Sequence, residues 1–225
     1  MDYGKLTKKA VVLDFDGTIC HLFGHYDLKA VNLELQRSLL MCGVNFEGYE
    51  DCFDAFKCIN NQQLDANVME KALITANRII EKAECEAVNT STEILGLTEF
   101  MEYCMEQGVR LGIASNNSPG CIHLYLKKKS LDKRIPVWGR DIHNLSHLKP
   151  DPWSLNKVVE EINISKEQVL FVGDNPTDYE CSLAAEVDFI AIASTEKKKK
   201  RFEKLESGCL LINNYFELLD LNIVG

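Results

Sequence analysis

Aspartate residues carry the strongest chemical signal in the sequence. Asp14 and Asp16 stand two positions apart at the end of an apolar run, and Asp174 and Asp178 follow a second apolar run late in the chain. Carboxylates held close together repel one another unless a cation offsets their charge, and hard oxygen ligands of this kind suit Mg²⁺. These four aspartates are therefore the candidate ligands of a magnesium site.

Three polar residues between the two pairs of aspartates could bind an anion. Ser115 and Asn116 end another apolar run, and Lys149 lies just before a segment with helical periodicity. A lysine and a hydroxyl that face a metal site suit a phosphate, whose negative charge lies on several oxygens. Taken singly, Ser115 and Asn116 are typical of a helix N-cap and Lys149 of an exposed loop. The hypothesis of an anion site depends on their meeting at one place.

Buried strands that alternate with helices would bring these residues together. Continuous apolar runs indicate strands buried on both faces, and segments with helical spacing of apolar residues lie between them. We therefore predict an α/β fold with three layers, in which helices cover both faces of a parallel sheet. Ligands of such sheets bind outside the carboxyl ends of the strands. The predicted strands are 10–16, 109–115, 168–174, 188–194 and 209–213.

The segment 20–89 interrupts this alternation. It contains no convincing strand, but its apolar residues recur at helical spacing in 27–40 and in 67–84. We expect an all-helical domain inserted after the first strand. The predicted division is an α/β core formed by 1–19 and 90–225, with a small helical cap at 20–89. Because every candidate catalytic residue lies outside this segment, we expect the cap to control which substrate is used.

Composition and charge exclude several classes of protein. The net charge of -9 argues against nucleic-acid binding, which requires a basic face, and the basic run 197–201 is interpreted as solvated surface. The sequence has no apolar run of about 18 residues and no signal-peptide pattern at its start, so we expect a cytoplasmic protein without a membrane segment. Nine cysteines without a CxxC pair indicate neither a disulfide framework nor a zinc site.

The polar motifs resemble those of a known superfamily. DFDGT (14–18), Ser115, Lys149 and GDNPTD (173–178) resemble, in order and spacing, the four motifs of the haloacid dehalogenase (HAD) superfamily of phosphatases and phosphomutases. The segment 20–89 resembles the helical C1-type cap of the subgroup that includes phosphoglycolate phosphatase and β-phosphoglucomutase. The resemblance spans most of the core and implies a Rossmann-like, three-layer fold.

The resemblance implies a role for each aspartate. Asp14 would be the nucleophile that forms an aspartyl-phosphate. Asp16 would protonate the leaving oxygen and later take a proton from water, and its backbone carbonyl would bind Mg²⁺. Asp174 would complete the protein's share of the metal ligands, and Asp178 would be a weaker ligand or would support one.

The remaining motif residues would bind the phosphoryl group. Ser115 and Lys149 would hold its oxygens as catalytic residues, with Asn116 beside them, and Lys149 would also offset the charge of Asp14. Gly17 would allow a close approach of the backbone, and Thr18 would support the loop. The partner implied is a small phosphorylated metabolite.

The sequence departs from the subgroup's pattern after DFDGT. The subgroup usually continues with an aliphatic residue, a small residue, Asp and then Ser or Thr, whereas this chain reads ICHLFGHYD (19–27). Cys20, His21 and His25 do not match, which weakens any transfer of the subgroup's substrate. His21 and His25 lie where the loop leaves the predicted active site for the cap, so both are candidates for contact with the substrate, with His21 the preferred one. The alternative is that they are hinge or surface residues.

Several functions remain open at this point. A phosphatase is favoured, and a phosphomutase of the β-phosphoglucomutase type would use the same core with a cap that excludes water. Asp16 and Asp174 argue against halide removal, which needs no metal and no acid partner. A phosphonate-cleaving enzyme would need a reactive cap lysine such as Lys29, Lys57 or Lys71. A catalytically inactive binding protein is the last alternative.

Overall fold

One parallel sheet forms the centre of the protein. The computed structural model describes residues 8–131, 135–205 and 208–222. The sheet has the strand order β5-β4-β1-β6-β7-β8, so the chain builds one side of the sheet from β1 outward and then crosses over to build the other. Ligands of α/β sheets bind at such a switch point. The strands are β1 (Ala10–Leu13), β4 (Arg110–Ala114), β5 (Val137–Trp138), β6 (Val169–Gly173), β7 (Asp188–Ile192) and β8 (Leu210–Ile212).

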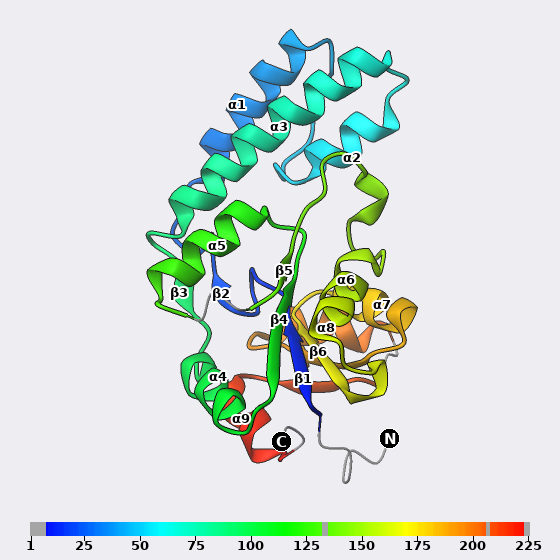
Figure 1. Ribbon diagram of the computed structural model, residues 1–225. Helices are drawn as coiled ribbons and strands as arrows, with labels where there is room; N and C mark the ends of the chain where they lie inside the picture. Colours follow the sequence, from blue (N-terminus) through cyan, green and yellow to red (C-terminus); the bar gives the residue numbers. More distant parts are fainter. Residues whose placement is uncertain (1–7, 132–134, 206–207, 223–225) are drawn as a thin grey trace.

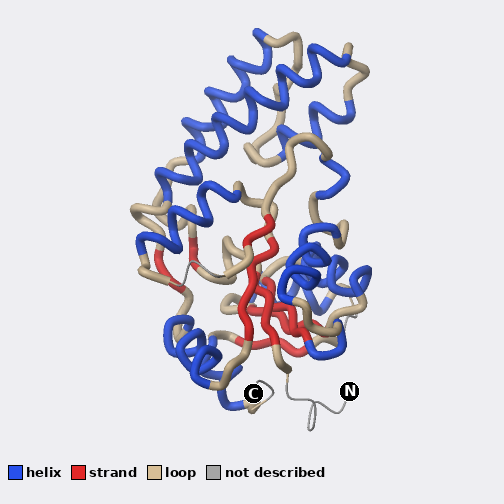
Figure 2. Tube along the Cα trace, in the orientation of Figure 1, coloured by secondary structure: helices blue, strands red, loops and turns tan. Residues whose placement is uncertain are grey.

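Helices cover both faces of the sheet, which confirms the predicted three-layer α/β fold (Figure 2). Val11 and Leu13 of β1 belong to an apolar cluster with one set of helices, and Ala10 and Val12 belong to a cluster with the other set. This alternation explains why the strands read as continuous apolar runs. The first layer contains α4 (Leu97–Glu106), α5 (Pro119–Lys128) and α9 (Tyr215–Asp220), and the second contains α6 (Trp153–Ile162), α7 (Pro176–Ala185) and α8 (Glu196–Glu203).

The five predicted strands are present, with somewhat shorter bounds. The sequence did not predict β5, whose two residues are too few to show a pattern. Lys149 follows this strand at a distance, after a short 3₁₀ helix, η1 (Leu145–His147). A second 3₁₀ helix, η2 (Lys166–Gln168), leads into β6.

The inserted segment forms three helices, α1 (Leu28–Met41), α2 (Asp54–Asn61) and α3 (Ala66–Ala87), that gather beyond one end of the sheet (Figure 1). They pack around an apolar cluster of their own, which includes Leu35, Phe56 and Ile80. Periodicity indicated α1 and α3 but not the short α2. None of the described helices is both long and apolar enough to span a bilayer.

A small antiparallel ribbon joins the two ends of this insertion. It consists of β2 (Cys20–His21) and β3 (Thr92–Glu93), with Cys20 opposite Glu93. The expectation that 20–89 contains no strand was therefore wrong at its first two residues. Two residues cannot show the alternation by which a strand is recognised.

Candidate active site

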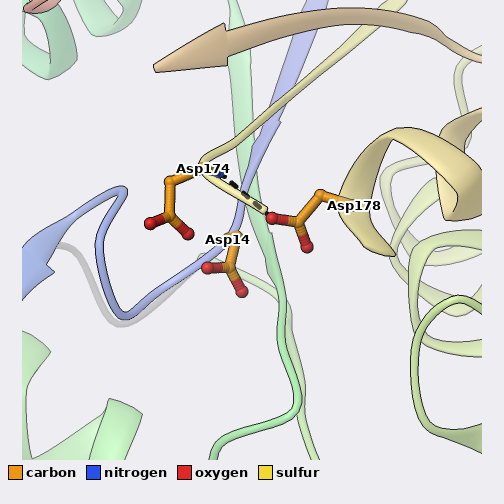
Figure 3. Close-up of side chains that lie close together, drawn as sticks. All are labelled: Asp14, Asp174 and Asp178. Carbon is orange, nitrogen blue, oxygen red and sulfur yellow. Dashed lines mark hydrogen bonds between the residues drawn. The ribbon is translucent and has the colours of Figure 1, made fainter. Parts of the chain in front are cut away.

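Three aspartates meet at the carboxyl edge of the sheet. Asp14 directly follows β1, Asp174 directly follows β6, and Asp178 lies in the first turn of α7. Each offers one carboxylate oxygen, and the three oxygens lie within 4.8 Å of one another (Figure 3). The structure thus brings together three of the four predicted metal ligands, and an oxygen-rich set of this kind fits a hard divalent cation.

Lys149 lies among these carboxylates and is itself buried. Its Nζ donates to Asp14 Oδ1 at 2.6 Å and to Asp178 Oδ1 at 2.5 Å. Burial by itself lowers the pKa of Lys149, but the two adjacent carboxylates outweigh burial and raise the pKa. The ammonium group therefore stays protonated and offsets much of the repulsion between the aspartates.

Both oxygens of Asp178 are engaged within the protein. Oδ1 accepts from Lys149, and Oδ2 accepts from the backbone N–H groups of Asp174, at 3.1 Å, and Asn175, at 3.0 Å. Figure 3 marks the first of these two backbone bonds. Together with the Asn175 side chain, this arrangement forms a capping box at the start of α7. Asp178 therefore fixes the loop that carries Asp174.

Asp16 is half-buried, and its side chain lies outside the cluster of three aspartates. Its Oδ1 accepts from the backbone N–H of Leu22 at 2.9 Å. Burial raises the pKa of Asp16 to about 7, with the Leu22 hydrogen bond opposing this shift and the charges of Asp14 and Asp174 adding to it. A carboxyl group with a pKa near 7 suits an acid that must also act as a base.

The loop after Asp16 is shaped by a close approach to Asp174. Gly17 has a φ of +84°, and a Cβ at this position would overlap the Asp174 carboxylate. Only glycine fits both conditions. Thr18 is buried, and its backbone oxygen accepts a hydrogen bond from the Tyr215 hydroxyl at 3.1 Å. Helix α9 thus supports the loop.

The polar residues after β4 are bonded to the lysine loop and to one another. Asn116 Oδ1 accepts from Lys149 N at 2.8 Å, and its Nδ2 donates to Lys149 O at 3.3 Å. The buried Ser115 hydroxyl donates to Asn117 Oδ1 at 3.0 Å. Asn116 therefore fixes the backbone of Lys149, and Asn117 holds the hydroxyl of Ser115.

A cavity of about 270 Å³ opens at this edge of the sheet, and the insertion contributes to its wall. Asp51 and Phe53, from the segment that leads into α2, lie in its lining. No pattern in the sequence indicated these two residues, because they occupy a loop without periodicity. The other lining residues are Asp14, Asp16, Asn116, Asn117, Lys149, Asp174, Asn175, Thr177 and Asp178.

The two histidines near the insertion lie at its surface. His21 and His25 are exposed, and neither is among the residues that line the cavity. The pKa of His21 is lowered by the partial burial of its side chain and by the ammonium group of Lys198, which together outweigh the charge of Asp174. Contact of His21 with a substrate stays a prediction.

Lys198 is a residue of this site that the sequence did not reveal. Its Nζ lies 2.8 Å from Asp174 Oδ2 and 3.2 Å from the backbone oxygen of Gly17. The interpretation of 197–201 as solvated surface was therefore wrong for Lys198, although Lys197 and Lys200 are exposed. Its position shortly after β7, another strand ending at the same edge, was the available signal.

The fold and this cluster define an α/β protein with a candidate metal and anion site at the switch point of its sheet. A family model described as haloacid dehalogenase-like hydrolase matches residues 11–192. The chain therefore belongs to the haloacid dehalogenase-like hydrolase family, as its motifs predicted.

Individual relatives agree with this membership. A phosphoglycolate phosphatase of Rhodospirillum rubrum is 33% identical over 88 residues, which are 39% of this chain and 36% of that protein. The pyrophosphatase PpaX of Bacillus mycoides is 26% identical over 149 residues, or 66% of this chain and 67% of that protein. The chain thus spans between about a third and two thirds of the length of these relatives.

A solved structure shows the same fold over nearly the whole chain. A hydrolase from Pseudomonas syringae has a TM-score of 0.67 and 16% identity, and the match covers 97% of this chain and all of that one. An identity this low supports the fold and not a shared substrate.

Proposed function

We propose that the protein is a magnesium-dependent phosphatase that hydrolyses a small phosphomonoester through an aspartyl-phosphate on Asp14. One observation carries this proposal. Lys149 bridges Asp14 and Asp178 beside Asp174 in a cavity, so an anionic nucleophile, a cation for the phosphoryl oxygens and candidate metal ligands share one place. The residues gathered here are the same residues that form the family's motifs in the sequence.

The proposed reaction has two half-reactions on this chain's own residues. In the first, an Asp14 oxygen forms a bond to phosphorus while the bond from phosphorus to the leaving oxygen breaks, and Asp16 gives its proton to that oxygen. In the second, Asp16 takes a proton from water as the water oxygen attacks phosphorus and displaces Asp14. The pKa of Asp16, raised to about 7 by burial, supports both duties at neutral pH.

The residues present fit a divalent cation. Asp14 and Asp174 would offer carboxylate oxygens to it, and the family resemblance adds the backbone carbonyl of Asp16. Asp178 would fix the loop of Asp174, because both of its own oxygens are already bonded. Bound Mg²⁺ would offset the charge on the phosphoryl oxygens during transfer. Lys149 and Ser115 would also hold those oxygens.

Removal of divalent metal is expected to abolish turnover of an aryl phosphate, because the carboxylate cluster would then repel the anionic substrate. The measurement is release of p-nitrophenol from p-nitrophenyl phosphate before and after chelation and dialysis, with Mg²⁺ added back as the control. Undiminished turnover by the dialysed protein would contradict the metal assignment.

Parallel assays that score both phosphate release and isomer formation from sugar phosphates separate a phosphatase from a phosphomutase.

The cap is expected to select the leaving group through Asp51, which is one of the residues that line the cavity. Asp51 Oδ1 accepts a hydrogen bond from the backbone N–H of Phe53 at 2.9 Å. Asp51→Asn keeps an oxygen for this hydrogen bond but removes the negative charge. The ratio of kcat/KM for phosphoglycolate to that for glycerol phosphate should rise about two- to fivefold, as expected for an exposed charge.

Glu47→Gln provides the matched control for Asp51→Asn. Glu47 is exposed in the same inter-helix segment and does not line the cavity, so the substitution removes the same charge outside the site. Its ratio of kcat/KM values should equal that of the unaltered protein. Equal ratios in both variants would show that Asp51 does not face the leaving group.

A further inference from the structure

A buried ion pair connects the insertion to the core. Arg140 follows β5, and Glu84 lies in the last part of α3. The guanidinium donates from Nη1 to Glu84 Oε1 at 3.0 Å and from Nη2 to Glu84 Oε2 at 2.9 Å. The two side chains are 1% and 0% exposed. Desolvating two charges is costly, so a pair of this kind is better evidence for a fixed geometry than for stability.

The same pair holds the loop that follows β4. Glu84 Oε1 accepts from Asn117 Nδ2 at 3.0 Å, and Glu84 Oε2 accepts from the backbone N–H of Ser118 at 3.2 Å. Arg140 Nη1 donates to the backbone oxygen of Asn116 at 3.0 Å. Each of the three consecutive loop residues 116–118 is therefore hydrogen-bonded to Glu84 or to Arg140.

These contacts lead to Ser115, which the motifs predict to bind the phosphoryl group although it does not line the cavity. The Nδ2 group of Asn117 faces Glu84, which leaves its Oδ1 facing the Ser115 hydroxyl. The Ser115 oxygen also accepts from the backbone N–H of Asn117 at 3.3 Å, which keeps it in place when its hydrogen rotates from Asn117 Oδ1 to a phosphoryl oxygen. Neither Glu84 nor Arg140 lines the cavity, so any effect of the pair on the reaction is indirect, and the bonded loop offers the shortest route.

We propose that Glu84 and Arg140 are positioning residues for phosphoryl transfer. Glu84 orients Asn117, and Asn117 in turn places the Ser115 hydroxyl. A helix of the cap thus takes part in arranging the core's phosphoryl site. This inference rests on the proposed phosphatase function. A pair that only attached the insertion to the core would alter stability and would leave Ser115 unaffected.

A double-mutant cycle of Glu84→Gln and Asn117→Ala tests the route through Asn117. Each single variant should lower kcat for p-nitrophenyl phosphate about 10- to 100-fold, as expected when a reacting group is misplaced. The double variant should be no slower than Asn117→Ala alone, because the proposed effect of Glu84 on Ser115 passes through Asn117. Losses that multiply in the double variant would overturn the proposal, and so would an unchanged kcat in Glu84→Gln.

Glu86→Gln is the matched control, since Glu86 lies on the same turn of α3 but is exposed and bonds the Tyr26 hydroxyl instead. Its kcat should be unchanged. If Glu84→Gln does not fold, Glu84→Asp replaces it in the cycle. The shorter side chain keeps the charge beside Arg140 but withdraws it from Asn117.

Affinity for inorganic phosphate gives a readout that does not depend on turnover. Calorimetric titration in the presence of Mg²⁺ should show weaker phosphate binding in both single variants and no further weakening in the double variant. Full phosphate affinity in Glu84→Gln would overturn the positioning role. Absence of turnover in the unaltered protein would instead contradict the phosphatase proposal, and the phosphate titrations would still decide the role of Glu84.

Discussion

Asp14→Asn is expected to abolish both turnover of p-nitrophenyl phosphate and the covalent phosphoryl adduct. The amide is nearly isosteric with the carboxylate but is a poor nucleophile and no longer forms the ion pair with Lys149, whose Nζ lies 2.6 Å from Asp14 Oδ1. The loss of kcat should be about 10⁴-fold or more, as expected when a nucleophile is removed. Intact-mass analysis after incubation with an activated phosphate would detect the adduct.

Asp220→Asn is the matched control for this change, because Asp220 is exposed at the end of α9. It should retain both turnover and the adduct. An adduct on the Asp14→Asn variant would show that another residue is the nucleophile. Retained turnover without an adduct would point to direct attack by water.

Asp16→Asn is expected to retain formation of the adduct and to lose turnover. The amide oxygen of the substituted side chain can still accept from the Leu22 N–H, so the loop should keep its shape, but the proton donor and base are gone. The steady-state rate of hydrolysis should fall about 10²- to 10⁴-fold. Intact mass of the variant after exposure to an activated phosphate, compared with its steady-state rate, checks this result.

The leaving group provides an internal control for the role of Asp16. An alkyl phosphate needs a proton on its leaving oxygen, whereas p-nitrophenolate leaves without one. The loss in the first half-reaction should therefore be larger for glycerol phosphate than for p-nitrophenyl phosphate. An equal loss for both substrates would contradict a role as general acid, and an adduct on Asp14→Asn but not on Asp16→Asn would exchange the two assignments.

The sequence by itself determined the core and the motif residues at its edge. Apolar runs long enough to be buried on both faces predicted the strands, and strands that run parallel present their carboxyl ends at one edge. Asp14 and Asp174 follow directly from this rule, because each stands at the end of a strand in the printed sequence. The periodicity of 27–40 and 67–84 likewise predicted α1 and α3.

Only the tertiary structure decided which residues from distant segments complete the site. Lys198 reaches Asp174 from α8, and Asp51 enters the cavity from a loop before α2. Glu84 and Arg140 meet across 56 positions of sequence, and Asn117 links Ser115 to the pair. An ion pair leaves no local pattern, because it depends on where two elements pack and not on the spacing within either. Charged side chains in a helix or loop read as solvated surface until the packing of the elements buries them.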